Sequence, residues 1–269
     1  CSVIYLGRTL MEFGHFAYDG SKRVWTLAFP VIAEDLVMCG RFTLRTNPRE
    51  WAEILRVARE LSSEWQPAYN IAPTQSVVCV RDTDQREFFK AKWGLLPPWT
   101  KDPKTGAMCI NARVETIAEK PTFRSSFKKK RCLVLADGFY EWVTVSEGKK
   151  DVKYPHYITL KSGHPMTFAG LWEEWKSPEG PVLSCTICTT TANDFMGRIH
   201  DRMPIILPLA TVDHWLDPNV TDPEEIKPML LQFPGEELQE WEVSREVNTY
   251  KSQGPQLIEP IGPKENLWF

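Results

Sequence analysis

The sequence of 269 residues lacks a long uninterrupted apolar run. The stretch that comes nearest to one, from Val24 to Ala33, is broken by Pro30 and followed at once by Glu34 and Asp35. A helix that crosses a bilayer needs about 20 apolar residues, and a signal peptide ends in small residues rather than acidic ones. We therefore predict neither a membrane segment nor a targeting segment.

A regular cysteine framework is also missing. The seven cysteines are an odd number without even spacing, which disfavours a disulfide scaffold and indicates a reducing compartment, the cytosol or the nucleus. Cys185 and Cys188 form a Cys-x-x-Cys pair, but the sequence has no second such pair and no histidine at ligand spacing. The alternating residues around them predict a strand with buried structural cysteines. We predict no metal site and no cofactor.

The chain has no large excess of charge of either sign. It has 32 Lys and Arg against 35 Asp and Glu, and its formal net charge of −3 excludes the general attraction for nucleic acid of a histone-like protein. A local exception is the run RSSFKKKR, residues Arg124–Arg131. This run fits either a solvated loop or an edge that faces phosphate groups, and the sequence leaves both open.

Aromatic residues and proline are plentiful, with 11 Trp, 13 Phe and 21 Pro against 15 Gly. From Tyr69 onward, short apolar runs alternate with Asp, Gly, Pro or Asn, which is typical of an antiparallel β-meander or a distorted barrel. We predict a single α+β domain over residues 38–262, built on such a barrel with flanking helices. Residues 1–37 are expected to be an extension outside the fold, and 263–269 a short tail.

Two segments carry helix signals. Residues 47–63, NPREWAEILRVARELSS, predict a helix with Asn47 as its N-cap and Pro48 in its first turn. Residues 221–233, TDPEEIKPMLLQF, predict a second helix that begins after Thr221 or Asp222.

Four polar clusters stand at the ends of apolar runs, where functional side chains are often displayed. They are MCGR, INARVET, ADGFYEW and RIHDRMP, and their notable members are Cys39, Arg41, Asn111, Arg113, Glu115, Asp137, Glu141, Trp142, Arg198, His200, Asp201 and Arg202. Taken singly, each cluster also fits a turn, a helix cap or a structural histidine.

Taken together and in this order, the clusters resemble the SRAP family (SOS response-associated peptidase), whose members crosslink to abasic sites in DNA. The resemblance runs from Met38 to Gly262 and includes MCGRF, YNIAPTQ, WGLLPPW, INARVET, RCLVLADGFYEW, HDRMP and the closing VNTYKSQGPQLIEP. It implies a monomeric protein of the cytosol or nucleus that captures abasic sites in single-stranded DNA, acts once per molecule, and has replication-fork proteins as further partners.

The resemblance also implies roles for matching residues. Cys39 would be the covalent nucleophile, Asn111 would hold the reacting sugar or amine, and Glu141 and His200 would move protons. The implied DNA-contacting residues are Arg41, Asn70, Pro73, Trp99, Arg113, Trp142 and Arg202.

The chemistry of an abasic site requires a free amine on Cys39. An N-terminal cysteine carries an amine and a thiol on adjacent carbons, so the amine can form an imine with the sugar aldehyde and the thiol can close a thiazolidine ring. The free α-amine, with a pKa of about 7.7 to 8.0 against about 10.4 for lysine, offers roughly 300-fold more free base near neutral pH. Slow reversal through the same groups is expected.

Cys39 must therefore be the first residue of the working protein. We expect either that Met38 is the initiator and is removed, or that the chain is cleaved after Met38, including by itself. Two other functions stay open. One is a non-covalent module for single-stranded DNA or modified bases that relies on phosphate contacts and stacking. The other is an N-terminal-nucleophile cysteine peptidase with His200 as the base.

Overall fold

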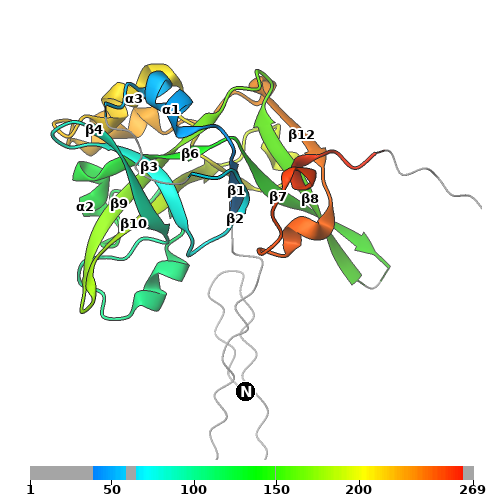
Figure 1. Cartoon of the computed structure of the whole chain (residues 1–269), viewed down its shortest axis with the longest axis horizontal. Helices are drawn as coiled ribbons and strands as arrows, with labels where there is room; N and C mark the ends of the chain where they lie inside the picture. The colour runs from blue at the N-terminus through cyan, green and yellow to red at the C-terminus, as the bar shows by residue number, and fades with distance from the viewer. Residues whose placement is uncertain (1–38, 59–64, 149, 263–269) are drawn as a thin grey trace, which may run out of the picture. The chain divides into compact units, whose positions relative to one another are not determined.

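The computed structural model describes residues 39–58, 65–148 and 150–262 (Figure 1). These residues belong to one compact unit. The expected extension 1–37 and tail 263–269 lie outside the described residues and stay predictions. Within the described part of the chain, no helix combines the length and the apolar character that crossing a bilayer requires.

A closed barrel forms one half of the architecture. Its strands are β3 (Ser76–Asp82), β4 (Arg86–Trp93), β6 (Arg131–Ala136), β9 (Met166–Ser177) and β10 (Gly180–Thr191). They pair in the order β10-β4-β3-β6-β9, and the circle closes because β9 and β10 also pair along an antiparallel ladder. Two short strands, β5 (Asn111–Arg113) and β11 (Arg202–Pro204), pair with β10 as well. The barrel is mixed, because β10 runs parallel to β4 and β5.

The second sheet has five antiparallel strands in the order β12-β8-β7-β1-β2. Their bounds are β12 (Leu238–Glu242), β8 (Lys150–Leu160), β7 (Gly138–Glu147), β1 (Arg41–Leu44) and β2 (Ala68–Ile71). One face packs on the barrel, where the ring of Phe42 meets Trp93 and Phe168 edge-on at centroid distances of 5.1 and 5.9 Å. The other face buries Tyr140 and Tyr157 beneath the chain after β12, orange to red in Figure 1. The predicted α+β barrel fold is confirmed.

Short helices flank the two sheets. The α-helices are α1 (Pro48–Leu55), α2 (Arg124–Lys129), α3 (Leu209–Leu216) and α4 (Pro223–Ile226). The 3-10 turns are η2 (Pro103–Met108), η3 (Met196–Arg198), η4 (Lys227–Met229), η5 (Gly235–Glu237), η6 (Arg245–Asn248) and η7 (Pro255–Ile258). Helices α1 and α3 lie side by side, because Arg86 of β4 donates to the carbonyl of Leu55 and pairs with Asp213 (Figure 1).

The first predicted helix begins as expected and ends early. The side chain of Asn47 caps α1 by accepting from the N–H of Arg49 at 2.9 Å. The helix stops at Leu55 because Arg56 adopts a left-handed conformation with φ 54, and the N–H of Val57 turns back to the carbonyl of Ala52. The predicted continuation of the helix past Leu55 is therefore wrong for residues 56–58, and residues 59–63 lie outside the described residues. The second prediction is confirmed at its start, since Asp222 caps α4.

The basic run Arg124–Arg131 is not a loop, so the first of its two interpretations is wrong, and the second, an edge that faces phosphate groups, stays a prediction. Most of it forms α2, and Arg131 opens β6 as a buried residue. The Arg131 guanidinium donates to four carbonyls, those of Phe127, Lys128, Trp215 and Asp217. Its charge therefore stabilises the carbonyl ends of α2 and α3. The exposed cations of the run are Arg124, Lys128 and Lys129.

The barrel holds a group of buried free cysteines. Cys79, Cys132, Cys185 and Cys188 are each fully buried, which confirms the predicted burial of the Cys-x-x-Cys pair. Among the described residues, no group of three or more His, Cys, Asp and Glu side chains is arranged to hold a metal ion.

Candidate active site

Cys39 immediately precedes β1, and the pairing of β1 with β7 sets its position. Arg41 lies opposite Tyr140 in this antiparallel pair, so the chain just before Arg41 runs alongside Glu141. The backbone nitrogen of Cys39 donates to Oε1 of Glu141 at 2.8 Å. Both residues are buried, with 1% and 2% of their surface exposed. A nitrogen and a carboxyl group from positions 102 residues apart thus meet away from solvent.

The pKa of the Glu141 carboxyl is raised toward neutral pH. Its pKa rises from the ordinary 4.5 to about 8: burial is the largest cause, the hydrogen bond from the Cys39 nitrogen lowers the pKa in part, and the negative charge of Asp201 raises it. A general base or acid works best when its pKa lies near the working pH. Glu141 meets that condition beside the nitrogen of Cys39.

The pKa of the Cys39 thiol is shifted away from neutral pH. Burial, with the Glu141 carboxyl as a second cause, raises its pKa well above the ordinary value, so the sulfur stays protonated. The residue also holds a left-handed backbone with φ 41, a region that side chains other than glycine seldom occupy. Local backbone strain of this kind is typical of functional sites.

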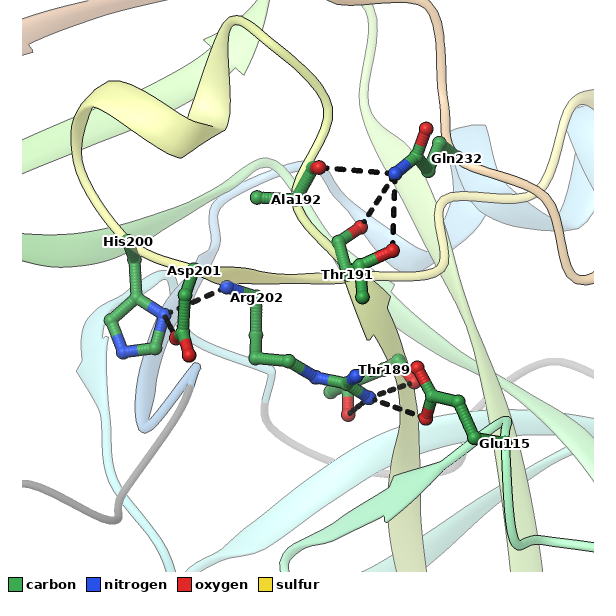
Figure 2. A network of polar contacts seen from close by, with 8 residues as sticks. All are labelled: Glu115, Thr189, Thr191, Ala192, His200, Asp201, Arg202 and Gln232. Atoms are coloured by element: carbon green, nitrogen blue, oxygen red, sulfur yellow. Dashed lines mark hydrogen bonds and ion pairs between the residues drawn. The ribbon is translucent and has the colours of Figure 1, made fainter. Parts of the chain in front are cut away.

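His200 lies on the loop between η3 and β11. Its Nδ1 accepts from the backbone N–H of Arg202 at 3.0 Å and lies 3.0 Å from a carboxylate oxygen of Asp201 (Figure 2). The N–H of Arg202 favours a lone pair on Nδ1, which places the proton of the ring on Nε2, whereas the Asp201 carboxylate favours a proton on Nδ1.

Arg202 is committed to internal partners. It is 8% exposed, its two terminal nitrogens donate to both carboxylate oxygens of Glu115 at 2.5 and 3.0 Å, and one of them also reaches the carbonyl of Thr189 at 2.8 Å (Figure 2). A bidentate pair of this kind fixes both side chains. The predicted DNA contact of Arg202 stays a prediction, and the geometry favours a role in holding the site together.

Strand β10 brings two of the four clusters together. On one side it pairs with β5, where Ile187 lies opposite Asn111 and Thr189 opposite Arg113. On the other side it pairs with β11, where Thr191 lies opposite Arg202. Asn111 is half-buried and Arg113 is exposed. The INARVET and RIHDRMP clusters thus form one edge of the candidate site. The ion pair between Glu115 and Arg202 joins them across more than 80 residues of sequence.

Arg41, Asn70 and Trp142 converge on a segment that sequence reasoning did not assign to the site, residues 247–253. Arg41 donates to Asn70 Oδ1 at 2.8 Å and to the carbonyl of Val247 at 2.7 Å. The indole N–H of Trp142 donates to Oδ1 of Asn248 at 2.8 Å. The segment belongs to the closing motif VNTYKSQGPQLIEP, which was the available signal.

Pro73 and Trp99 complete the predicted DNA-contacting residues. Pro73 follows β2 and is half-buried, whereas Trp99 is 58% exposed on the loop after β4. A large exposed indole fits base stacking. No described contact joins either residue to Cys39, so their roles stay predictions.

A sequence model of the family described as SOS response associated peptidase (SRAP) matches residues 38–250. The chain belongs to the SRAP family. The resemblance noted in the sequence is thereby confirmed, and the matched region contains Cys39, Glu141 and the other predicted site residues.

Proteins similar to this chain include several named as abasic site processing proteins. Over 225 residues this chain is 42% identical to the "abasic site processing protein YoqW" of Bacillus subtilis, covering 82% of this chain and 99% of that protein. It is 32% identical to chicken HMCES, covering 82% and 74%, and 29% identical to YedK of Escherichia coli, covering 83% and 100%; both are also named abasic site processing proteins.

Solved structures agree in fold. A protein from Bacteroides thetaiotaomicron superposes with a TM-score of 0.71 at 25% identity, covering 83% of this chain and all of that one. A phage-related protein from Bordetella bronchiseptica has a TM-score of 0.63 at 29% identity, covering 77% and 95%.

Proposed function

We propose that this SRAP protein captures abasic sites in single-stranded DNA as a covalent thiazolidine adduct of Cys39, and that it acts once per molecule. The observation that carries the proposal is the hydrogen bond from the Cys39 backbone nitrogen to the buried carboxyl of Glu141. The names of the similar proteins, which process abasic sites, support the choice of substrate.

The proposal requires that the working protein begins at Cys39, with its nitrogen as a primary amine. Removal of Met38 as initiator or cleavage after Met38 would produce this form. The nitrogen would then keep its place beside Glu141, and the carboxylate would accept the proton that the amine must lose before it attacks a carbonyl carbon. The left-handed backbone of Cys39 favours the same form, because a terminal residue has no preceding carbonyl to clash with.

The bonds balance without a co-reactant. The amine nitrogen adds to the aldehyde carbon C1 of the opened sugar, and the resulting carbinolamine loses one water to give an imine. The thiol sulfur then adds to C1, and the thiol proton passes to the nitrogen. A five-membered ring results, and the second step is intramolecular. A thiol kept neutral by burial suits this order, in which nitrogen reacts first and sulfur follows.

The other residues would act around this centre. His200 Nε2 would protonate the sugar ring oxygen as the ring opens, and Asn111 would hold the reacting sugar or amine. Around them, the cationic and aromatic residues would contact the strand through phosphates and bases: Arg41, Arg113, Trp142, Trp99 and Pro73.

The cysteine-peptidase alternative is weaker on physical grounds. Peptidases of that kind attack with a thiolate, whose formation depends on a lowered pKa. Burial and Glu141 raise the pKa of the Cys39 thiol instead.

Intact-mass spectrometry tests the proposal. Protein prepared to begin at Cys39 is mixed with a single-stranded oligonucleotide that carries one abasic site, and the expected product has the summed mass less one water. Cys39→Ala should form no such adduct, whereas Cys188→Ala, which alters a cysteine of the barrel wall, should form it normally. Peptide mapping should place the adduct on the first residue.

Two results would refute the covalent mechanism. One is an adduct of equal yield in Cys39→Ala or an adduct mapped to a lysine. The other is tight binding of DNA with no adduct at all, which would instead support the non-covalent binding module.

A further inference from the structure

Residues 247–253, here called the C-terminal strap, close over the edge strand β2. The amide nitrogen of Asn70 donates to three strap carbonyls, those of Val247, Thr249 and Ser252, at 3.1 to 3.2 Å. In return, the side chain of Gln253 bonds to the N–H of Tyr69 and the carbonyl of Asn70, at 2.9 and 3.1 Å. Because β2 ends the sheet, Gln253 satisfies groups that a further strand would otherwise pair. The strap is thus an integral edge of the sheet.

The strap leaves the charge of Arg41 uncompensated. The Arg41 guanidinium is half-buried, and its hydrogen-bond acceptors are Asn70 Oδ1 and the carbonyls of Val247 and Asn248. All three acceptors are neutral, and no ion pair joins Arg41 to a carboxylate among the described residues. A partly desolvated cation held only by neutral dipoles attracts an anion such as a phosphate.

The strap also sets the orientation of Trp142. This residue follows Glu141 on β7, so the two side chains point to opposite faces of the sheet, and the ring of Trp142 packs on the face that Tyr140 and Tyr157 occupy. Its indole N–H donates to Oδ1 of Asn248 at 2.8 Å, across 106 residues of sequence. The direction in which a tryptophan ring presents its face for stacking depends on its rotamer. The hydrogen bond to Asn248 favours one rotamer of Trp142.

We propose that Asn248 is a positioning residue for single-stranded DNA, acting through the ring of Trp142. In this proposal Asn248 does not touch the reacting atoms. It fixes the Trp142 face for a base beside the abasic site, while the strap carbonyls hold Arg41 for the adjoining phosphate. The proposal rests on the proposed function and deepens it, because it assigns Asn248 and the carbonyls of Val247 and Asn248 to the support of the DNA-binding residues Trp142 and Arg41.

The experiment separates binding from chemistry. The first measurement is the Kd for a single strand that carries a tetrahydrofuran analogue, which lacks the aldehyde and therefore cannot crosslink. The second is the rate of adduct formation at saturating abasic DNA. Asn248→Ala should weaken binding by about three- to tenfold, the effect of one lost hydrogen bond. The rate at saturation should not change.

The matched control lies on the same strap. Thr249→Ala removes an exposed side chain and keeps the carbonyl that Asn70 contacts, so it should bind like the wild type. Thermal unfolding of both variants checks that the strap stays folded. If Asn248→Ala binds as tightly as Thr249→Ala, the proposal is wrong.

A double-mutant cycle tests the route through Trp142. Trp142→Phe keeps an aromatic face but has no N–H to donate, so Asn248→Ala should have no further effect on Kd in that background. An equal loss in both backgrounds would show that Asn248 acts by another route and would overturn the proposal.

The two proposals fail in distinguishable ways. If wild-type protein binds the analogue but never forms an adduct, the proposed covalent function is lost while the Asn248 comparison still decides the strap. If adducts form and Asn248→Ala binds normally, only the positioning role is lost.

Discussion

Cys39 beside the five-stranded sheet and Cys188 in the barrel wall are buried to almost the same degree, with 1% and 0% of their surface exposed. Burial raises the pKa of both thiols, and in Cys39 the Glu141 carboxyl adds to the effect. The two residues differ at the nitrogen. That of Cys39 donates to a buried carboxyl, whereas Cys188 lies within β10 and is paired with β5. If Cys39 is the reactive cysteine, as we propose, burial by itself does not mark it, and the partner of its backbone nitrogen does.

The largest expected effect comes from blocking that nitrogen. Protein that retains a residue before Cys39 has an amide there, which is not nucleophilic, so we expect complete loss of the DNA adduct. Protein that begins at Cys39 should form it, and Cys188→Ala should match wild type because its change lies in the barrel wall. Parallel intact-mass measurements on abasic single-stranded DNA decide this. An adduct on the blocked protein would remove the distinction between the two cysteines.

The second-largest effect is expected from a change at Glu141, the carboxyl partner of the Cys39 nitrogen. Glu141→Gln keeps a hydrogen-bond acceptor for the nitrogen but cannot accept a proton, so adduct formation should slow by about 10²- to 10⁴-fold. The rate is measured by quenched time courses at saturating DNA, alongside Kd for the tetrahydrofuran analogue. Binding should be unchanged. An equal loss of binding would show that Glu141 has a structural rather than a chemical role.

Stability should depend on pH through the same group. In protein with an amide at Cys39, the folded carboxyl of Glu141 has a pKa of about 8 against an ordinary 4.5, so the folded state keeps a proton that the unfolded state has lost between these values. The unfolding free energy should therefore fall as pH rises from 5 to 8, by roughly 3 to 5 kcal/mol relative to Glu141→Gln. Denaturant titrations at both pH values measure this.

The form that begins at Cys39 provides the contrast for the pH experiment. A protonated terminal amine beside Glu141 favours the carboxylate and lowers its pKa, so the fall in unfolding free energy should be smaller. An equal pH dependence in the two forms would mean that the nitrogen and the carboxyl are not in contact.

The smallest effect concerns Asp201, whose negative charge raises the pKa of Glu141. Asp201→Asn should lower that pKa and move the acid limb of the rate-pH profile to lower pH. Asp194→Asn, an exposed aspartate on the same loop, is the control and should leave the limb in place. If both variants give the same profile as wild type, the charge of Asp201 does not reach Glu141.

Local signals in the sequence were enough for some of these features. The N-caps at Asn47 and Asp222 depend on neighbouring residues, and both are present in the structure. The end of α1 at Leu55 was not foreseen, because the apolar spacing continues past it while the backbone of Arg56 turns left-handed. The run Arg124–Arg131 was misjudged for a related reason: the carbonyls that receive Arg131 include two from residues 215 and 217.

The sequence by itself determined the family, the α+β barrel class and the identity of the candidate residues, because these depend on motifs and on the spacing of apolar and turn residues. Only the tertiary structure decided which of them meet. The pairing of β1 with β7 brings the Cys39 nitrogen to Glu141, and the strap brings Asn248 to Trp142, in each case across more than 100 residues. Contacts over such separations depend on strand register and burial, which no local pattern specifies.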